Sequence, residues 1–169
     1  ENRDDFILAL YLGRYAGFRI HECFRIDTAA AERALRENAL TIKGKGDKVR
    51  TVPIEDERIL MMLKRVLART ERGHKLLVPD GMPTDRAINA LELFIYRHRN
   101  EISDEGSDRR LTFHGLRHTY AAEKYTRLTE GGMSAIDAHY AVSRLLGHER
   151  ADVTDIYLAS VRKRGSDGE

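Results

Sequence analysis

Two basic side chains with complementary chemistry lie three residues apart, at His114 and Arg117. On a helix this spacing places both on one face, where they can contact the same ligand. The planar fork of an arginine suits two oxygens of a phosphate, and a histidine exchanges a proton near neutral pH. The pair therefore indicates a site for an oxyanion, while an ordinary basic helix surface stays open as the alternative.

His114 and His118 are also four residues apart, which is the spacing of a pair of zinc ligands on a helix. Such a zinc motif carries a glutamate directly after the first histidine, where this sequence has Gly115. No third ligand lies close in sequence, and Arg117 would repel a cation. We therefore expect no metal and no other cofactor, with a zinc hydrolase as a less favoured alternative.

Further segments with basic and aromatic residues follow one another along the chain. They are Gly17-Phe18-Arg19-Ile20-His21-Glu22, Gly44-Lys45-Gly46, His114-Gly115-Leu116-Arg117-His118, Leu145-Leu146-Gly147-His148 and Tyr157. This order resembles the tyrosine recombinase, or phage integrase, family, whose signature is Arg, Lys, His-x-x-Arg, His or Trp, and Tyr. The Leu-Gly-His step with a tyrosine nine residues later is among the more specific parts of that signature, and the resemblance spans nearly the whole chain.

The resemblance implies that Tyr157 is a nucleophile and that Lys45 is a general acid. Tyr157 would attack a DNA phosphodiester to give a 3′-phosphotyrosyl link, and Lys45 would protonate the departing 5′ oxygen. Because the pKa of a tyrosine is near 10, the phenol needs a nearby cation or base. A new 5′ hydroxyl can reverse the step, so the reaction needs no ATP. The basic side chains of the motifs can supply the positive field that a metal would otherwise provide, so we expect the reaction to need no metal.

The resemblance also implies how the remaining site residues act. Arg19 and Arg117 would clamp the non-bridging oxygens, where phosphoryl transfer places charge. His114 would serve as a base or donor, and His148 would add a hydrogen bond. Glu22 lies one helical turn after Arg19 and is expected to fix its rotamer, with a surface ion pair as the alternative.

A basic cluster surrounds Lys45, and the expected partner is double-stranded DNA. We predict DNA contacts for Lys43, Lys48 and Arg50, while the formal net charge of +2 alone is weak evidence for a polyanionic partner. The glycines on both sides of Lys45 favour it over its neighbours, since a bare backbone lets the turn approach DNA closely. The resemblance implies a homo-tetramer on DNA for the full-length protein and a monomer for the isolated domain.

The favoured function is site-specific DNA recombination for the integration or excision of a mobile element. A type IB topoisomerase shares the tyrosine chemistry and is the near alternative. A DNA-binding regulator that keeps the fold without catalysis is a third. Among the seven tyrosines, only Tyr157 follows Leu-Gly-His at the family spacing, and we expect Tyr11, Tyr15 and Tyr96 to lie in the core.

The elements that must position these residues are predicted from periodicity and capping residues. We expect an α+β, mainly helical fold, namely the tyrosine recombinase catalytic-domain fold with a small antiparallel β-sheet or hairpin. The first expected helix is capped by Asp4 or Asp5 and ends near Gly17, and a second starts near Ile20. A third contains 59–67 and is closed by Gly73, and a fourth follows Thr84. The remaining helices follow Thr112, run from Ser134 to Gly147, and hold Tyr157. Strands are expected at 40–43 and 49–54, and a helical turn within 28–37.

The length and composition suit one globular domain. The 169 residues, 41% hydrophobic and 33% charged, can bury a single core, so we expect one catalytic domain over 1–169 with a frayed tail at 165–169. The lone Cys23 is expected to be buried, and the sequence contains no apolar run long enough for a membrane span. We expect a cytoplasmic prokaryotic protein that acts on nucleoid DNA, without the amino-terminal DNA-binding module that the family places before this domain.

Overall fold

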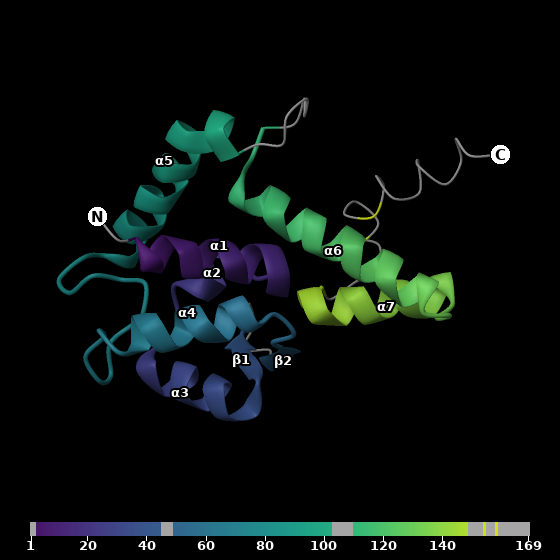
Figure 1. The fold of residues 1–169 in the computed structure, drawn as a ribbon, viewed down its shortest axis with the longest axis horizontal. Coiled ribbons are helices and arrows are strands. Elements are labelled where there is room, and N and C mark those ends of the chain that lie inside the picture. The colour runs from purple at the N-terminus through teal and green to yellow at the C-terminus, as the bar shows by residue number, and fades with distance from the viewer. Residues whose placement is uncertain (1–2, 45–48, 103–109, 149–153, 155–157, 159–169) are drawn as a thin grey trace.

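The computed structural model describes residues 3–44, 49–102, 110–148, 154 and 158. Helices dominate, and two strands form one small sheet (Figure 1). The elements in order are α1 (Asp4–Ala16), α2 (Ile20–Cys23), α3 (Thr28–Glu37), β1 (Ala39–Lys43), β2 (Val49–Pro53), α4 (Glu57–Leu67), α5 (Thr84–Ile102), α6 (Phe113–Glu130) and α7 (Ala135–Leu146). This architecture confirms the predicted fold class.

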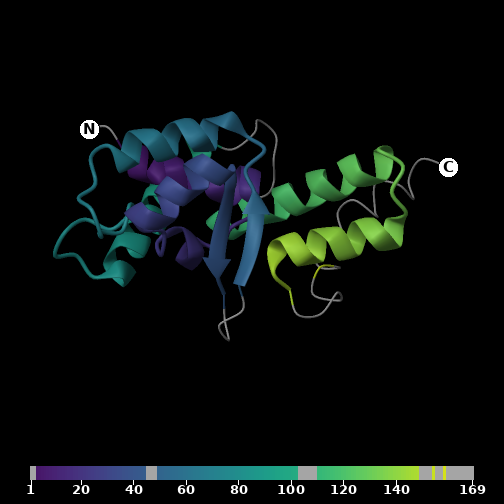
Figure 2. The ribbon, with the colours of Figure 1, turned by 90° about the horizontal axis from the view of Figure 1, so that it is seen from below.

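Strands β1 and β2 form an antiparallel hairpin whose side chains alternate between two environments. The register pairs Ala39 with Pro53 and Ile42 with Arg50. Ile42 and Val52 are buried, because successive residues of a strand point to opposite faces and these two point inward. The hairpin extends past the end of α7 (Figure 2), and β2 contacts that helix.

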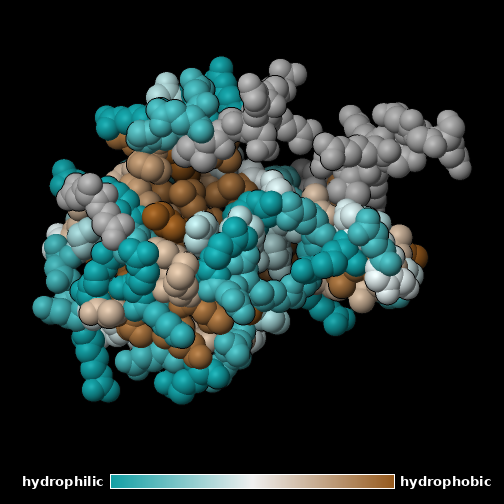
Figure 3. All heavy atoms as spheres, viewed as in Figure 1, coloured by the Kyte–Doolittle hydropathy of each residue, from teal (hydrophilic) through white to brown (hydrophobic). Residues whose placement is uncertain are grey.

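Helix α1 lies at the centre of the domain and packs against both α4 and α6. Leu8 and Leu12 of α1 are fully buried in the main core, together with Leu63 of α4. A second, smaller cluster joins α6 to α7 and includes Leu146 and Leu158. Apolar side chains gather between α5 and the helices beneath it (Figure 3). A groove of about 600 Å³ near the start of α5 is lined by apolar residues such as Phe6 and Leu77 and by charged ones such as Arg69 and Asp80.

Capping residues end the helices that carry the site, as the sequence predicts. Gly17 follows α1 with φ 68°, and Gly147 follows α7 with φ 66°, both in the left-handed conformation. Thr112 caps α6 by accepting a hydrogen bond from the Gly115 N–H, and Ser134 caps α7. These caps fix the points at which the chain leaves α1 and α7 and enters α6.

Two of the predicted helix ends are wrong. Asp4 does not cap α1, because it is the first helical residue and its buried carboxylate binds Arg65 and Arg69 at the end of α4. Gly73 does not end α4, which stops at Leu67 with Ala68 as its cap. Arg65 and Arg69, which are about half exposed, pair with the buried Asp4 from a distant part of the chain, and a local sequence pattern does not contain such contacts.

Three further expectations can be compared with side-chain burial. Tyr96 is 61% exposed, with the guanidinium of Arg99 over its ring, so its predicted core position is wrong. Tyr11 and Tyr15 are partly buried against the core, and Cys23 is fully buried as predicted. Burial raises the pKa of the Cys23 thiol well above its usual value. Among the described residues, no helix is both long and apolar enough to cross a bilayer.

Candidate active site

Arg19 stands at the start of α2, two residues after the left-handed turn at Gly17 that ends α1. Its backbone N–H donates to Glu22 Oε2 at 2.7 Å, and its Nη1 donates to Glu22 Oε1 at 3.1 Å. The Arg19 side chain is 41% exposed, whereas that of Glu22 is 4% exposed. The structure therefore has the contact between Glu22 and Arg19 that the sequence predicts, with the acid beneath the arginine.

Arg50 of β2 binds the same carboxylate from the other side. Its Nη1 and Nη2 donate to the two oxygens of Glu22 at 2.7 and 2.8 Å, and its Nε donates to the Leu145 carbonyl at 3.1 Å. The side chain is 13% exposed. This position differs from the DNA-facing one that we expected for Arg50, because its guanidinium is used inside the protein.

The alternation of inward and outward side chains along β2 could have predicted that Arg50 points into the protein. Arg50 and Val52 are two residues apart in a strand and therefore share a face, and Val52 is fully buried. A buried acid such as Glu22 also requires a cationic partner. Burial raises the Glu22 pKa, but the hydrogen bonds and charges of Arg50 and Arg19 outweigh it and hold the pKa below its usual value.

Arg117 is 1% exposed and joins the ends of two helices. Its Nη1 donates to the carbonyl of Gly17, and its Nη2 donates to the carbonyl of Leu146 at 2.6 Å. The same Nη2 lies 3.2 Å from Nε2 of His148. The guanidinium therefore connects the turn before Arg19 to the turn that carries His148.

His148 follows the glycine that ends α7 and is held on both sides of its ring. Nε2 faces Arg117, and Nδ1 lies 2.8 Å from the hydroxyl of Thr154. Burial lowers the His148 pKa, the positive charges of Arg117, Arg19 and Arg50 lower it further, and the result is about 4. The ring is consequently neutral at pH 7, and Thr154 is a contact that sequence reasoning missed.

His114 lies one turn before Arg117 on α6, at the surface of the domain. Its ring stacks edge-on against His118, with ring centroids 4.6 Å apart. Burial, together with the positive charges of Arg117 and Arg19, lowers the His114 pKa. A neutral imidazole can accept a proton, which is one of the two roles, base or donor, that the resemblance implies for His114.

The other predicted site residues divide into one that the structure describes and three that it does not. Lys43 is exposed at the end of β1, where its backbone carbonyl accepts from Arg25 at 3.2 Å. Lys45, Lys48 and Tyr157 lie outside the described residues. Leu158, directly after Tyr157 in sequence, packs between α6 and α7 in the second core cluster.

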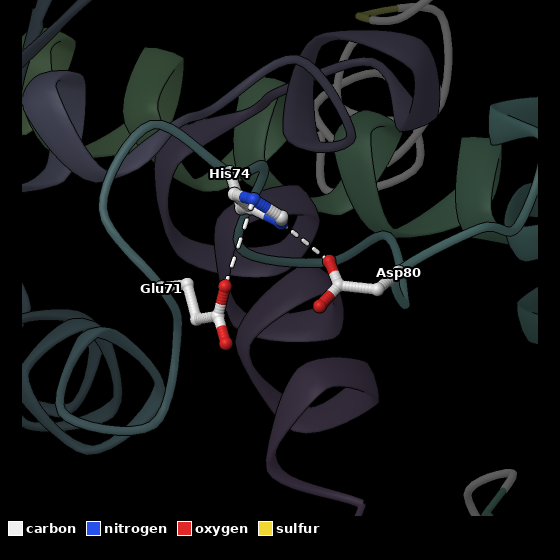
Figure 4. Close-up of side chains that lie close together, drawn as sticks. All are labelled: Glu71, His74 and Asp80. Carbon is white, nitrogen blue, oxygen red and sulfur yellow. Dashed lines mark hydrogen bonds and ion pairs between the residues drawn. The ribbon is translucent and has the colours of Figure 1, made fainter.

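A different part of the molecule holds the one group with metal-ligand geometry within the described ranges. Glu71, His74 and Asp80 lie close together on the exposed loop after α4, with His74 directed at both carboxylates (Figure 4). A hydrogen bond and the charge of Asp80 raise the His74 pKa, as an ion pair would. His114 and His118 do not belong to this group.

Solved structures with the same fold are tyrosine recombinases and integrases. The XerA recombinase superposes with a TM-score of 0.67 at 19% identity, covering 98% of this chain and 57% of that one. The integrase of mycobacterium phage Brujita gives a TM-score of 0.60 at 23% identity, covering 95% of this chain and 51% of that one. The domain thus has the fold of a tyrosine recombinase catalytic domain.

The model of the phage integrase family matches residues 3–164, and the chain belongs to this family. It is 28% identical to the tyrosine recombinase XerD of Pseudomonas putida over 137 residues, which cover 77% of this chain and 42% of XerD. It is 26% identical to the tyrosine recombinase XerC of Caldanaerobacter subterraneus over 160 residues, 93% of this chain and 41% of XerC. The chain spans about two fifths of the length of these curated relatives.

Proposed function

We propose that this domain is the catalytic part of a site-specific DNA recombinase that breaks and rejoins DNA through a covalent link to Tyr157. One observation carries the proposal. Four basic side chains from separate parts of the chain are held together, namely Arg19 before α2, His114 and Arg117 on α6, and His148 after α7. Arginine donors stabilise the charge that develops on a phosphate during transfer, and a neutral histidine beside them can take up a proton.

In the reaction we propose, one phosphoester bond forms as another breaks. The phenolic oxygen of Tyr157 attacks the phosphorus, its proton passes to His114, and a phosphotyrosyl bond forms. The bond from phosphorus to the 5′ oxygen breaks, and Lys45 gives that oxygen a proton. Ligation is the same exchange in reverse, with a 5′ hydroxyl as the attacking group, so no ATP is consumed.

The arginines bind the phosphate in this proposal, and the structure suggests how. Arg19 is 41% exposed and can reach a ligand directly. Arg117 is buried, with its terminal nitrogens on two backbone carbonyls, so phosphate binding by Arg117 requires exchange of at least one of those contacts. Nε2 of His148 accepts from Arg117, so a hydrogen bond from this nitrogen to phosphate requires the same exchange and a proton on Nε2.

The proposed partner is double-stranded DNA. Two solved structures of the same fold are a XerH recombinase bound to a palindromic difH substrate after cleavage and a Tn1549 transposon integrase in complex with a circular intermediate DNA. Lys43 at the exposed end of β1, with Lys45 and Lys48 following in sequence, is the proposed contact on this chain. We further propose a tetramer on DNA for the full-length protein, a monomer for the domain alone, and a location on the bacterial nucleoid.

A nicked DNA duplex tests the nucleophile. A nick placed beside the scissile phosphate releases a short fragment after attack, which prevents religation and traps the enzyme on DNA. The full-length protein, incubated with such duplexes tiled across the DNA that flanks its gene, should form a covalent adduct in EDTA. Tyr157→Phe should abolish the adduct, and an adduct that persists in this variant would exclude Tyr157 as the nucleophile.

A further inference from the structure

Glu22 is a buried carboxylate whose two oxygens are each shared by two donors. Oε1 accepts from Arg50 Nη1 at 2.7 Å and from Arg19 Nη1 at 3.1 Å. Oε2 accepts from Arg50 Nη2 at 2.8 Å and from the Arg19 backbone at 2.7 Å. With the Glu22 side chain 4% exposed, these four hydrogen bonds supply the solvation that water gives to a surface carboxylate.

The two arginines hold Glu22 unequally. Arg50 binds both oxygens with its fork, a geometry that is stronger and more directional than a single contact. Arg19 makes one longer side-chain contact and keeps 41% of its side chain exposed, against 13% for Arg50. One carboxylate carries one negative charge, so the bidentate pairing with Arg50 leaves Arg19 only weakly held.

Arg50 also contacts the turn that carries His148. Its Nε binds the Leu145 carbonyl, and its guanidinium fits against Gly147 so closely that a Cβ at this position would lie 2.6 Å from Nη1. The arginine therefore touches both the acid beneath Arg19 and the end of α7. Strand β2 delivers this side chain inward because Arg50 shares a face with the buried Val52.

We propose that Arg50 is a positioning residue for the reaction, which keeps Arg19 available to the phosphate by satisfying Glu22 and fixes the turn before His148. The inference rests on the proposed function, in which Arg19 and His148 contact the scissile phosphate. Without Arg50, the buried Glu22 has Arg19 as its remaining side-chain partner. The charge of Glu22 would then draw the Arg19 fork into a bidentate pair and away from DNA.

Four variants of the full-length protein test this role on a nicked duplex that the wild type cleaves. Arg50→Met keeps the length of the side chain but removes its donors, and Arg50→Lys keeps the charge but not the fork. The double variant E22Q/R50M removes the carboxylate that would capture Arg19. Arg14→Met is the matched control, because Arg14 forms an equally bidentate pair with Glu123, at 2.6 and 2.8 Å, away from the site.

We expect replacement of Arg50 to lower the single-turnover rate of adduct formation without a matching loss of DNA affinity. Arg50→Met should lower the rate roughly 10- to 100-fold, since displacing a positioned group by about 1 Å can cost about 100-fold. DNA affinity should stay within about threefold, because Arg50 contacts protein rather than DNA in this proposal. The double variant E22Q/R50M should react about tenfold faster than Arg50→Met. The rate of Arg50→Lys should lie between those of Arg50→Met and the wild type. The control Arg14→Met should match the wild-type rate within about twofold.

Several outcomes would overturn the role of Arg50. They are an unchanged rate in Arg50→Met, a double variant as slow as Arg50→Met, or an affinity that falls in step with the rate, which would make Arg50 a DNA contact. If Arg50→Met fails to fold, the rate of Arg50→Lys becomes the test, and a wild-type rate in Arg50→Lys would reject the proposal. Failure of the wild-type protein to form any adduct would instead reject the proposed function, and with it the basis of this inference.

Discussion

Arg117 Nη2 lies 3.2 Å from His148 Nε2, and this contact decides which nitrogen of the histidine carries its proton. An arginine can only donate, so Nε2 must accept. In a neutral imidazole the proton is then on Nδ1, which donates to the Thr154 hydroxyl at 2.8 Å. The residue is held as a neutral acceptor toward Arg117, and protonating Nε2 would break the contact.

The stability of the domain should therefore fall in mild acid. The His148 pKa is about 4 in the folded protein against an ordinary value of 6.5, so between these values the unfolded chain binds more protons. The free energy of unfolding should decline as the pH falls from 6.5 towards 4, and the lowered Glu22 pKa should add to the decline below 4.5. Urea denaturation at pH 7, 6 and 5 measures this slope.

His148→Gln should flatten the decline between pH 6.5 and 5, and an unchanged slope would contradict a neutral His148. His74→Gln is the control, because the His74 pKa is raised by Asp80 rather than lowered. A raised pKa stabilises the fold below 6.5 and loses this effect as the pH rises through the folded value. His74→Gln should therefore alter the dependence of stability on pH above 6.5, and the decline in stability between pH 6.5 and 5 should remain.

Replacing Arg117 should destabilise the fold as well as abolish activity. In Arg117→Met the carbonyls of Gly17 and Leu146 lose their donors while remaining buried, which should cost roughly 2–5 kcal/mol. Arg127→Met on the same helix is the control, since Arg127 is 62% exposed and pairs with Glu55 at the surface. It should change the free energy of unfolding by less than about 1 kcal/mol. Equal losses in the two variants would argue against the structural role of Arg117.

Gly147 should tolerate no side chain, for two separable reasons. Its φ is 66°, and a Cβ would lie 2.6 Å from Nη1 and 3.0 Å from Cδ of Arg50. Gly147→Ala should therefore cost about 2–4 kcal/mol. Gly132→Ala isolates the backbone term, since Gly132 has φ 93° but nothing within 4 Å of the added atom, and should cost about 1–2 kcal/mol. Urea denaturation measures the loss of unfolding free energy in each variant, and the difference between the two losses is the contribution of the contact with Arg50.

Lys45 can be tested through the leaving group. If Lys45 protonates the departing 5′ oxygen, Lys45→Ala should slow adduct formation at least about 100-fold on ordinary DNA. A substrate with sulfur at the 5′ bridging position needs no acid, because a thiolate is a good leaving group, so the variant should react with it at nearly the wild-type rate. Lys43→Ala is the control and should slow the two substrates alike. Equal slowing of both substrates by Lys45→Ala would remove its assignment as the acid.

Local patterns predicted the elements of this domain better than its contacts. Gly17, Thr112 and Gly147 mark helix ends through backbone conformation and capping, which depend on near neighbours in sequence. The segment from Thr28 to Glu37, for which only a helical turn was expected, forms a helix of ten residues capped by Asp27. The small side chains of Ala31 and Ala34 are buried and let this helix pack closely against the domain, which the composition of the segment alone does not show.

The site was predicted as a set of residues but not as a network. Arg50 was grouped with surface lysines by charge, although its position in β2 turns it toward Glu22, twenty-eight residues earlier in the chain. Arg117 was predicted to bind phosphate, while its hydrogen bonds to Gly17 and Leu146 depend on helix ends far apart in sequence. Such contacts follow from tertiary packing, so periodicity and composition do not contain them.

The hairpin register has a consequence for how this domain can change in length during evolution. Ile42 pairs with Arg50, and side chains alternate along β2. One residue inserted between Arg50 and Val52 would turn the guanidinium to the opposite face and leave Glu22 without it. An insertion within 44–48 keeps that pairing intact. Variation in length should therefore fall between the two strands, while the spacing from Arg50 to Val52 stays fixed.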